Sequence, residues 1–437
     1  MPKRSFIRDV LGVFSSSIFS LINSFLISIF LSRILGPANY GIYVSILVVP
    51  LIVVGLVQFG IRRTAIFHIG NKKFDINDTV STIYILWLFA SFAGVIISAV
   101  SYYFIGNTNF SLSMIILVLV LIPLKLNLVY NGGVFLGKEE IKRANVLNWL
   151  PIFLNLIFII VFVYFIKLYV FGALLAMVLA NLFVAIYSQF IIISEYKLKF
   201  KINFEIIKSF LKLGFVFALS FVLLQLNYKV DILIMQKFST AKEIGYYSLG
   251  VSIAEQMWLL PYAIGVVVMS RSANATDQNA INKSTAMLLR LTLLLAIIGS
   301  VIVVVLTPYF LPLIFGEKFI PSIRIVQYIL PGIIFFIIVR ILDSRLAGIG
   351  KPHIAVLILI PSLIINIILN FLWIPKYAGM GAVMATNVSY IFGSVVFLFV
   401  YSNIVKMPVR EILIIKKDDF SLLFGIFRQF IMSKKNK

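Results

Sequence analysis

The feature that most limits the fold of this chain is a series of apolar runs, each long enough to cross a lipid bilayer. About 20 helical residues span the hydrocarbon core, and runs of that length recur from one end of the sequence to the other. They cover residues 10–31, 43–60, 83–105, 111–130, 146–166, 170–193, 211–232, 246–269, 286–307, 323–342, 353–373 and 380–402. We therefore predict an all-α polytopic membrane protein with about 12 transmembrane helices.

Charged residues support that count and set an orientation. With a cytoplasmic N-terminus, 29 of the 38 Lys and Arg residues fall in cytoplasmic segments and seven in outer segments, which leaves Lys125 and Lys229 within spans. This alternation follows the positive-inside rule and predicts that both termini are cytoplasmic. The first apolar stretch exceeds a signal-peptide core and lacks an A-x-A-like cleavage site, so we expect it to be retained. The net charge of +22 thus belongs to membrane loops, and we expect no nucleic acid partner.

A weak internal repeat predicts two lobes. Residues 135–155 resemble residues 346–366, with Asn155 matching Asn366, and GIYVS at 41–45 resembles GYYSL at 245–249. Because halves with an even number of spans share one topology, the repeat is parallel and its axis lies along the membrane normal, an architecture found in alternating-access transporters.

The predicted organisation has three parts. An N-terminal six-helix lobe covers residues 1–200, a C-terminal six-helix lobe covers 201–405, and a basic amphipathic cytoplasmic tail covers 406–437. The tail mixes apolar and basic residues without a clean 20-residue run, so we expect it to lie at the membrane interface rather than to span the bilayer. Its acidic pair, Asp418 and Asp419, is predicted to be solvated.

No group of residues is arranged for catalysis, and we predict that the protein is not an enzyme. GGVFLGKE at 132–139 has the spacing of a nucleotide-binding loop. However, Glu139 replaces the Ser or Thr that would hold magnesium, and an apolar helix precedes the motif in place of a strand. The chain has no Cys and only two His residues, which argues against disulfides and zinc sites.

Cationic residues in or beside the spans are candidates for substrate binding, since a central Lys costs about 2.5–3.5 kcal/mol to insert. Each has an alternative role, because a Lys can snorkel to lipid headgroups and an Arg near a helix end can simply set topology. The forked donors of Arg suit phosphate. We predict that a cationic cavity for an anionic substrate is formed by Lys125, Lys229, Arg33, Arg62 and Arg63.

Buried acids are candidates for ion coupling. Asp231 and Lys229 lie two residues apart on one helix, so their side chains point about 200° apart and we expect no pairing between them. Because an Asp side chain is too short to snorkel, we expect Asp231 to face the protein interior. Glu255 is a second candidate of this kind.

Polar residues of the last two spans complete a possible cation site. Asn366 and Asn370 share one helix face, and Thr386 lies in the next span. With Asp231 they offer one carboxylate and several neutral oxygens, the hard ligands that an alkali cation takes. Interhelical hydrogen bonds are the alternative role for these residues.

Three stretches resemble the polysaccharide transporter family of the multidrug, oligosaccharidyl-lipid and polysaccharide exporter superfamily. They are LSRILGPANYGIYV at 31–44, YKVDILIMQKFSTAKEIGYYSLGVSIAE at 228–255, and residues 346–390, which include GKPHIAVLILIPSLIIN. The resemblance extends over essentially the whole chain. It implies two lobes with 12 or 14 helices and a flippase function. Such a protein moves polyprenyl-diphosphate-linked oligosaccharide repeat units, for O-antigen or capsule, from the inner to the outer leaflet by alternating access.

The resemblance also implies a cation set. Some lipid-flipping relatives hold sodium with an acid on helix seven, an Asn and an acid four residues apart on helix eleven, and a Thr on helix twelve. Asp231, Asn366, Asn370 and Thr386 resemble that set, although Asn370 stands in place of the second acid. We expect no bound cofactor, and coupling to sodium or to protons.

Two related functions remain as alternatives. A cation-coupled drug or metabolite antiporter of the same superfamily would also need buried acids, but a cavity with several cations disfavours cationic cargo. A peptidoglycan-precursor (lipid II) flippase shares the lipid diphosphate but usually has fourteen helices. In either case we expect a multi-pass protein of the cell (cytoplasmic) membrane. Its expected partners are membrane lipids, the lipid-linked oligosaccharide, and a polysaccharide polymerase and ligase.

Overall fold

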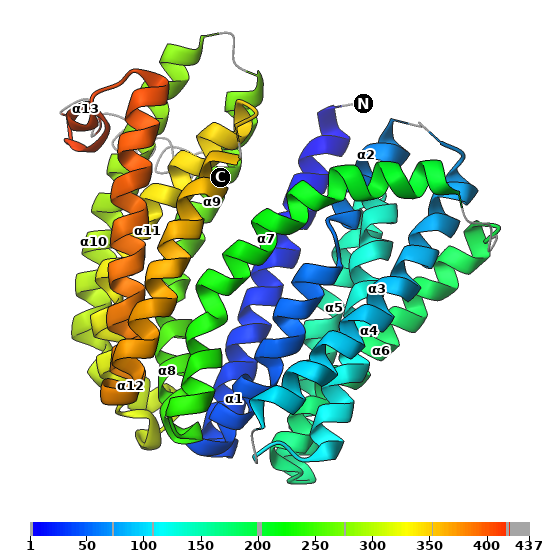
Figure 1. Ribbon diagram of the computed structural model, residues 1–437, viewed down its shortest axis with the longest axis horizontal. Helices are drawn as coiled ribbons and strands as arrows, with labels where there is room; N and C mark the ends of the chain where they lie inside the picture. Colours follow the sequence, from blue (N-terminus) through cyan, green and yellow to red (C-terminus); the bar gives the residue numbers. More distant parts are fainter. Residues whose placement is uncertain are drawn as a thin grey trace, which may run out of the picture. The chain divides into compact units, whose positions relative to one another are not determined.

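The computed structural model describes residues 3–71, 74–106, 109–198, 203–274, 277–351, 353–416 and 419. Within these ranges the regular secondary structure is helical (Figure 1). The first half contains α1 (Lys3–Val57), α2 (Ile61–Gly70), α3 (Ile76–Ile105), α4 (Leu112–Gly137), α5 (Ile141–Ile159), the π-helical turn η1 (Ile160–Phe165), α6 (Tyr169–Glu195) and α7 (Phe204–Phe238). The second half contains α8 (Ala241–Ala254), η2 (Glu255–Trp258), α9 (Leu259–Asn274), α10 (Gln278–Phe315), η3 (Glu317–Phe319), α11 (Ser322–Gly348), α12 (His353–Val405) and α13 (Val409–Leu413).

The chain is a multi-pass membrane protein. In the part that the structure describes, 9 helices are long and apolar enough to cross a bilayer. Two of them are far longer than one crossing: Ser15–Gly70 has 56 residues and His353–Val405 has 53, whereas a span needs about 20. Backbone breaks interrupt both, at Gly36 (φ 68°) and at Ala378 (φ 46°). Each break falls between two of the predicted spans, while the total of twelve and the side of each terminus stay predictions.

The described chain divides into two compact units. The first comprises Met1–Leu249 with Leu311–Pro321, and the second comprises Gly250–Phe310 with Ser322–Lys437. The boundaries fall within α8, within α10 and directly before α11. The predicted lobes at 1–200 and 201–405 were defined by the repeat, a different property from compactness, and their boundaries stay a prediction.

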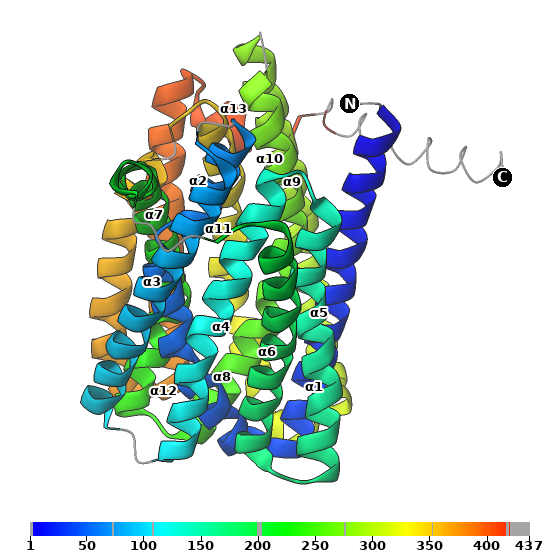
Figure 2. The ribbon, with the colours of Figure 1, turned by 90° about the vertical axis from the view of Figure 1, so that its right-hand side faces the viewer.

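In the first unit, α1, α3, α4, α5 and α6 run alongside one another (Figure 2). α7 changes direction along its length, and it contacts both α2 and α1 (Figure 1). Where α7 passes the break between α1 and α2, a Cβ on Gly214 would overlap the carbonyl oxygen of Phe59. Because any Cβ at position 214 would meet this carbonyl, a glycine is needed there for α7 to pack against the turn. Within the turn, Phe59 has a positive φ of 46°.

The glycine motif that has the spacing of a nucleotide-binding loop is a helix-packing site. It lies at the end of α4, where a Cβ on Gly133 would lie 3.0 Å from the Arg62 Cα and one on Gly137 would lie 2.8 Å from the Ile69 Cβ. The two glycines are four residues apart on one face, the spacing that lets membrane helices approach closely. They therefore pack α4 against α2.

A second glycine contact joins α1 to α8, again within the first unit. A Cβ on Gly41 would overlap the carbonyl oxygen of Ala241, and a Cβ on Gly245 would overlap that of Pro37. The two backbones thus touch with no side chain between them. Phe319 of η3 is fully buried beside this crossing, with its ring 5.8 Å from that of Tyr40 and 6.2 Å from that of Tyr246.

In the second unit, α11 packs between α9 and α12. Pro331 interrupts the hydrogen bonds of α11, and the side-chain amide of Asn387 on α12 fills the gap. It accepts from the Gly332 N–H at 2.9 Å and donates to the Tyr328 carbonyl at 2.7 Å, two groups that would bond each other in an unbroken α-helix. The proline kink is therefore held by a neighbouring helix.

The described part of the tail is fixed to α10. Arg290 donates from Nε to Asp419 Oδ2 at 2.7 Å and from Nη2 to Asp419 Oδ1 at 2.6 Å, and both side chains are buried. The prediction that Asp419 is solvated is therefore wrong, because it is paired with an arginine 129 positions earlier in the chain. Asp418, for which solvation was also predicted, lies outside the described residues, as do residues 417 and 420–437 of the predicted amphipathic tail.

Candidate functional site

Two of the predicted cationic residues lie along one face of α4. The Arg62 side chain crosses from α2, and its guanidinium carbon would lie 3.9 Å from a Cβ on Gly132. Lys125 is seven residues before Gly132 on the same helix. Seven residues are nearly two helical turns, so Lys125 and Gly132 lie about 10 Å apart along the helix axis and their Cα–Cβ directions are almost the same. Arg62 and Lys125 are both half-buried.

Neither of these cations has a counter-ion among the described residues. The ion pairs found there involve Arg143, Arg290 and Lys416. Lys125 lies within a predicted span, where an unpaired charge is costly, so it needs water, headgroups or an anionic ligand. A row of two cations along one helix face is suited to an anion with more than one charge.

The structure places the other predicted cations differently. Arg33 is exposed, and it donates to the carbonyl oxygens of Leu313 and Ile314, the latter at 2.7 Å. These carbonyls belong to the last turn of α10, where a cation is favoured by the helix dipole. Arg63 is exposed, and Lys229 is half-buried on α7. The substrate roles of these three residues stay predictions.

Asp231 lies in the interior of the first unit, where it is 3% exposed. The hydroxyl of Tyr247, on α8, donates to Oδ2 of Asp231, and the other carboxylate oxygen accepts from the Ile232 N–H at 2.8 Å. The expectation that Asp231 does not pair with Lys229 stays a prediction. Tyr247 was not identified from the sequence, because nothing local marks a residue 16 positions away as a partner.

In the second unit, α12 brings the predicted polar residues together across its break. Asn366 Nδ2 donates to Thr386 Oγ1 at 3.5 Å and to Ser389 Oγ at 3.3 Å, and Asn370 Nδ2 donates to Asn366 Oδ1 at 2.9 Å. All four side chains are buried. Ser389 is a further member of this cluster, and its position three residues after Thr386 was a signal that sequence reasoning missed.

The cluster has one oxygen suited to a cation. Asn370 Oδ1 is buried without a hydrogen-bond donor, while Asn366 Oδ1 and Thr386 Oγ1 already accept bonds from amides. Asn366 and Thr386 thus form a hydrogen bond between the two predicted spans, which was the alternative role for these residues. Asp231 belongs to the other compact unit, so the four-residue sodium set stays a prediction.

The segments that match this cluster in the sequence repeat carry apolar residues in place of two of its hydroxyl groups. Asn155 matches Asn366 and is buried, with its Oδ1 also unpaired. In the matching segments at 171–181 and 380–390, however, Met177 and Ala180 stand where the second half has Thr386 and Ser389. Glu255, the remaining predicted acid, begins η2 and is half-buried, and its role in coupling stays a prediction.

A model of the family described as polysaccharide biosynthesis protein matches residues 30–324 of this chain. A curated relative from Shigella flexneri, named "Putative O-antigen transporter", is 25% identical over 178 residues, which cover 40% of this chain and 42% of the relative. The matched part is thus less than half of that relative's length.

Solved structures show the same fold. A multidrug resistance MATE family transporter of the MOP superfamily, in an inward-facing conformation, matches with a TM-score of 0.76 and 13% identity over 89% of this chain and 94% of the other. The lipid II flippase MurJ, in an inward closed conformation, matches with a TM-score of 0.71 and 18% identity over 97% and 93%. With the family match covering well over half of the chain, these findings agree with the predicted resemblance, and the chain belongs to the polysaccharide biosynthesis protein family, with a MOP-superfamily transporter fold.

Proposed function

We propose that this protein is a flippase that moves polyprenyl-diphosphate-linked oligosaccharide repeat units from the inner to the outer leaflet of the cytoplasmic membrane by alternating access. The observation that carries the proposal is the row of Arg62 and Lys125 along α4, with no carboxylate partner among the described residues. A diphosphate presents more than one negative charge, and a guanidinium can bind two phosphate oxygens at once. The lipid tail would stay in the bilayer during transfer.

The same observation weighs against a drug antiporter. The fold matches both a multidrug transporter and a lipid flippase, so it does not separate these classes. Cationic drugs would be repelled by Arg62 and Lys125, whereas an anionic lipid diphosphate would be attracted. A lipid II flippase would share this preference, and its separation from the proposed function rests on the sugars of the cargo.

Deletion of the gene in its own host tests the function. We expect polyprenyl-diphosphate oligosaccharides to accumulate on the cytoplasmic face and surface polysaccharide to fall, as measured by extraction of lipid intermediates and by their accessibility to added enzymes. Accumulation of peptidoglycan precursors in their place would indicate a lipid II flippase. Unchanged intermediates and polymer, in a host without a second flippase, would contradict the proposal.

Point variants test the cationic row. Lys125→Met and Arg62→Gln remove charge and keep side-chain length, and we expect each to lower export by about tenfold, the effect of losing ~1.4 kcal/mol of binding. Lys142→Met is the matched control, since Lys142 is an exposed residue near the start of α5. Normal export by both row variants, at membrane levels equal to the control, would exclude these residues from substrate binding.

We further propose that transport is coupled to a cation and that the cluster of Asn366, Asn370, Thr386 and Ser389 takes part in binding it. Asn370 Oδ1, buried without a donor, supports this role. The product of such a flippase would be consumed on the outer face by a polymerase and a ligase, which we propose as functional partners.

A further inference from the structure

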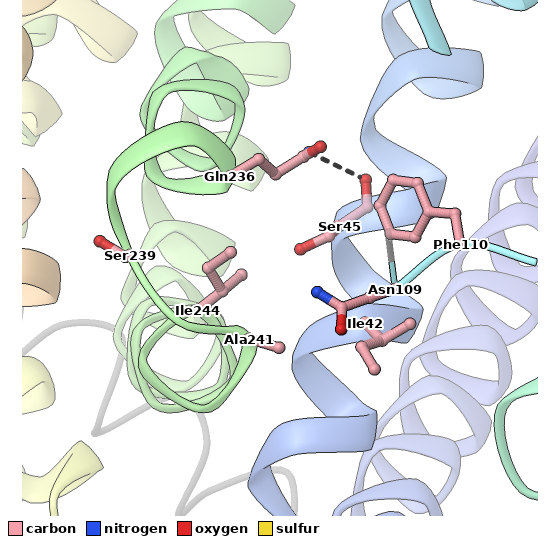
Figure 3. A pocket seen from close by; sticks show the side chains of 8 residues that line it. All are labelled: Ile42, Ser45, Asn109, Phe110, Gln236, Ser239, Ala241 and Ile244. Atoms are coloured by element: carbon pink, nitrogen blue, oxygen red, sulfur yellow. Dashed lines mark hydrogen bonds between the residues drawn. The ribbon is translucent and has the colours of Figure 1, made fainter. Parts of the chain in front are cut away.

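A small cavity lies within the first unit where α1, the loop before α4 and the turn from α7 to α8 meet. Its volume is about 20 Å³, and its polar lining residues are Ser45 on α1, Asn109 in the loop, Gln236 in the last turn of α7 and Ser239 directly after α7. Figure 3 shows the Ser45 hydroxyl and the Asn109 amide in the space between α1 and the α7–α8 turn. The other lining side chains are mainly apolar.

Three oxygen atoms of these lining residues are buried without a hydrogen-bond partner. They are Ser45 Oγ, Gln236 Oε1 and Ser239 Oγ. Gln236 cannot turn freely to find one, because its Nε2 donates to the Ser45 carbonyl at 3.1 Å (Figure 3). Figure 3 shows the Ser239 hydroxyl on the side of the α7–α8 turn away from Ser45 and Asn109. Buried polar atoms in folded proteins are nearly always paired with protein or with ordered water, so the other two atoms, Ser45 Oγ and Gln236 Oε1, point to a ligand between α1 and α7.

We propose that this cavity binds one water molecule that bridges Ser45 of α1 to Gln236 at the end of α7. Room for a single water requires roughly 10–15 Å³ of cavity volume, which this cavity exceeds. A water molecule donates two hydrogen bonds and accepts two. It can therefore donate to Gln236 Oε1, which only accepts, and also pair with the Ser45 hydroxyl, which both donates and accepts.

The donor set distinguishes water from a cation. The lining residues include no carboxylate, and a cation buried among neutral groups alone would lose its hydration without gaining a counter-charge. A hydroxyl bound to a cation would also need another acceptor for its own hydrogen. Water satisfies the same atoms without either cost.

The position of the water gives it a structural role. Ser45 is one turn beyond Gly41 on α1, and Ile244, which also lines the cavity, directly precedes Gly245 on α8. At Gly41 and Gly245 the two helices touch through backbone alone. The Gln236 bond to Ser45 and the proposed water bridge are polar links between α1 and α7 directly beside this seam.

Ser45→Ala in the full-length protein tests the proposal, with Ser98→Ala as the matched control. Both serines are buried with an unpaired Oγ, but Ser98 lies on α3 and does not line this cavity. Replacing an unpaired hydroxyl in a dry site should be neutral or stabilising. We therefore expect Ser98→Ala to leave the thermal midpoint in detergent unchanged or raised, and Ser45→Ala to lower it by about 1–2 °C because the water loses a partner.

Two further measurements decide the identity of the ligand. A structure of the unsubstituted protein that resolves ordered water should show one density peak within hydrogen-bond distance of Ser45 Oγ. Absence of the peak, or a Ser45→Ala midpoint that follows Ser98→Ala, would overturn the proposal. The Ser45→Ala effect should also be the same in sodium, potassium and choline chloride, and a difference that appears only with an alkali cation would overturn the assignment to water. None of these readouts depends on transport.

Discussion

Gly41 of α1 and Gly245 of α8 make reciprocal contacts. Each glycine lies against the carbonyl of the residue four positions before the other glycine, Ala241 in one direction and Pro37 in the other. A Cβ on Gly41 would lie 2.8 Å from the Gly245 nitrogen, and one on Gly245 would lie 3.2 Å from the Gly41 nitrogen. A two-fold relation between helices produces such paired contacts, and these helices carry the repeated segments GIYVS and GYYSL.

Alanine at either glycine should destabilise the protein. The added methyl would overlap a carbonyl oxygen of the other helix, and overpacking of this kind costs about 1–3 kcal/mol or more. We expect Gly41→Ala and Gly245→Ala to lower the thermal midpoint in detergent by several degrees. Gly70→Ala is the control, because a Cβ there meets nothing within 4 Å. Alanine variants at the crossing that are as stable as the control would show that the helices separate without cost.

The buried pair of Arg290 and Asp419 should make the tail depend on charge. Asp419→Asn leaves the Arg290 guanidinium buried without a counter-charge, a change that costs about 3–5 kcal/mol. We expect faster proteolysis of the tail and a lower thermal midpoint. Restoration by the double variant Arg290→Met with Asp419→Leu would confirm that the unpaired charge causes the loss. Glu411→Gln should have little effect, since Glu411 is exposed and lies 4.0 Å from Lys416.

Acid should release the same contact. The hydrogen bonds from Arg290, and then the backbone N–H of Lys416, lower the pKa of Asp419 below its usual 3.8. A carboxyl with a lowered pKa in the folded state stabilises that state above its unfolded pKa, and the stabilisation is lost as pH falls through the lowered value. Tail protection should therefore be constant from neutral pH down to about pH 4 and should fall at lower pH. A loss of protection already near pH 6 would contradict this assignment.

Asp231→Asn should abolish the ion dependence of transport while leaving normal amounts of protein in the membrane. The substitution removes the charge and keeps an oxygen that can accept from Tyr247. Tyr247→Phe should have a smaller effect on ion dependence, because the carboxylate remains. Transport by Asp231→Asn with unchanged dependence on sodium and pH would exclude Asp231 from coupling.

Asn370→Leu should remove any cation response of the second unit. The side chain is buried and its Oδ1 has no donor, so a bound cation would raise the thermal midpoint of the unsubstituted protein by mass action. We expect sodium to stabilise that protein and not the variant. Asn403→Leu is the control, because Asn403 is an exposed residue of α12. Equal sodium responses in both variants would place the cation elsewhere.

The membrane class and the approximate positions of the helices could be predicted because bilayer insertion depends on local hydropathy and on the placement of Lys and Arg. Those properties are written in contiguous residues. The polar cluster on α12 was also predictable in part, because Asn366 and Asn370 share a face by their spacing, and Thr386 lies in the neighbouring span.

The sequence alone thus determined that the chain crosses the membrane many times and that a few charged and polar residues are placed where insertion is costly. Only the tertiary structure decided their partners: Tyr247 for Asp231, the carbonyls of α10 for Arg33, Arg290 for Asp419, and Gly245 for Gly41. The physical reason is that membrane helices are apolar on every side, since lipid is as apolar as a protein core. Their sequences therefore mark which segments enter the bilayer but carry little information on which faces meet.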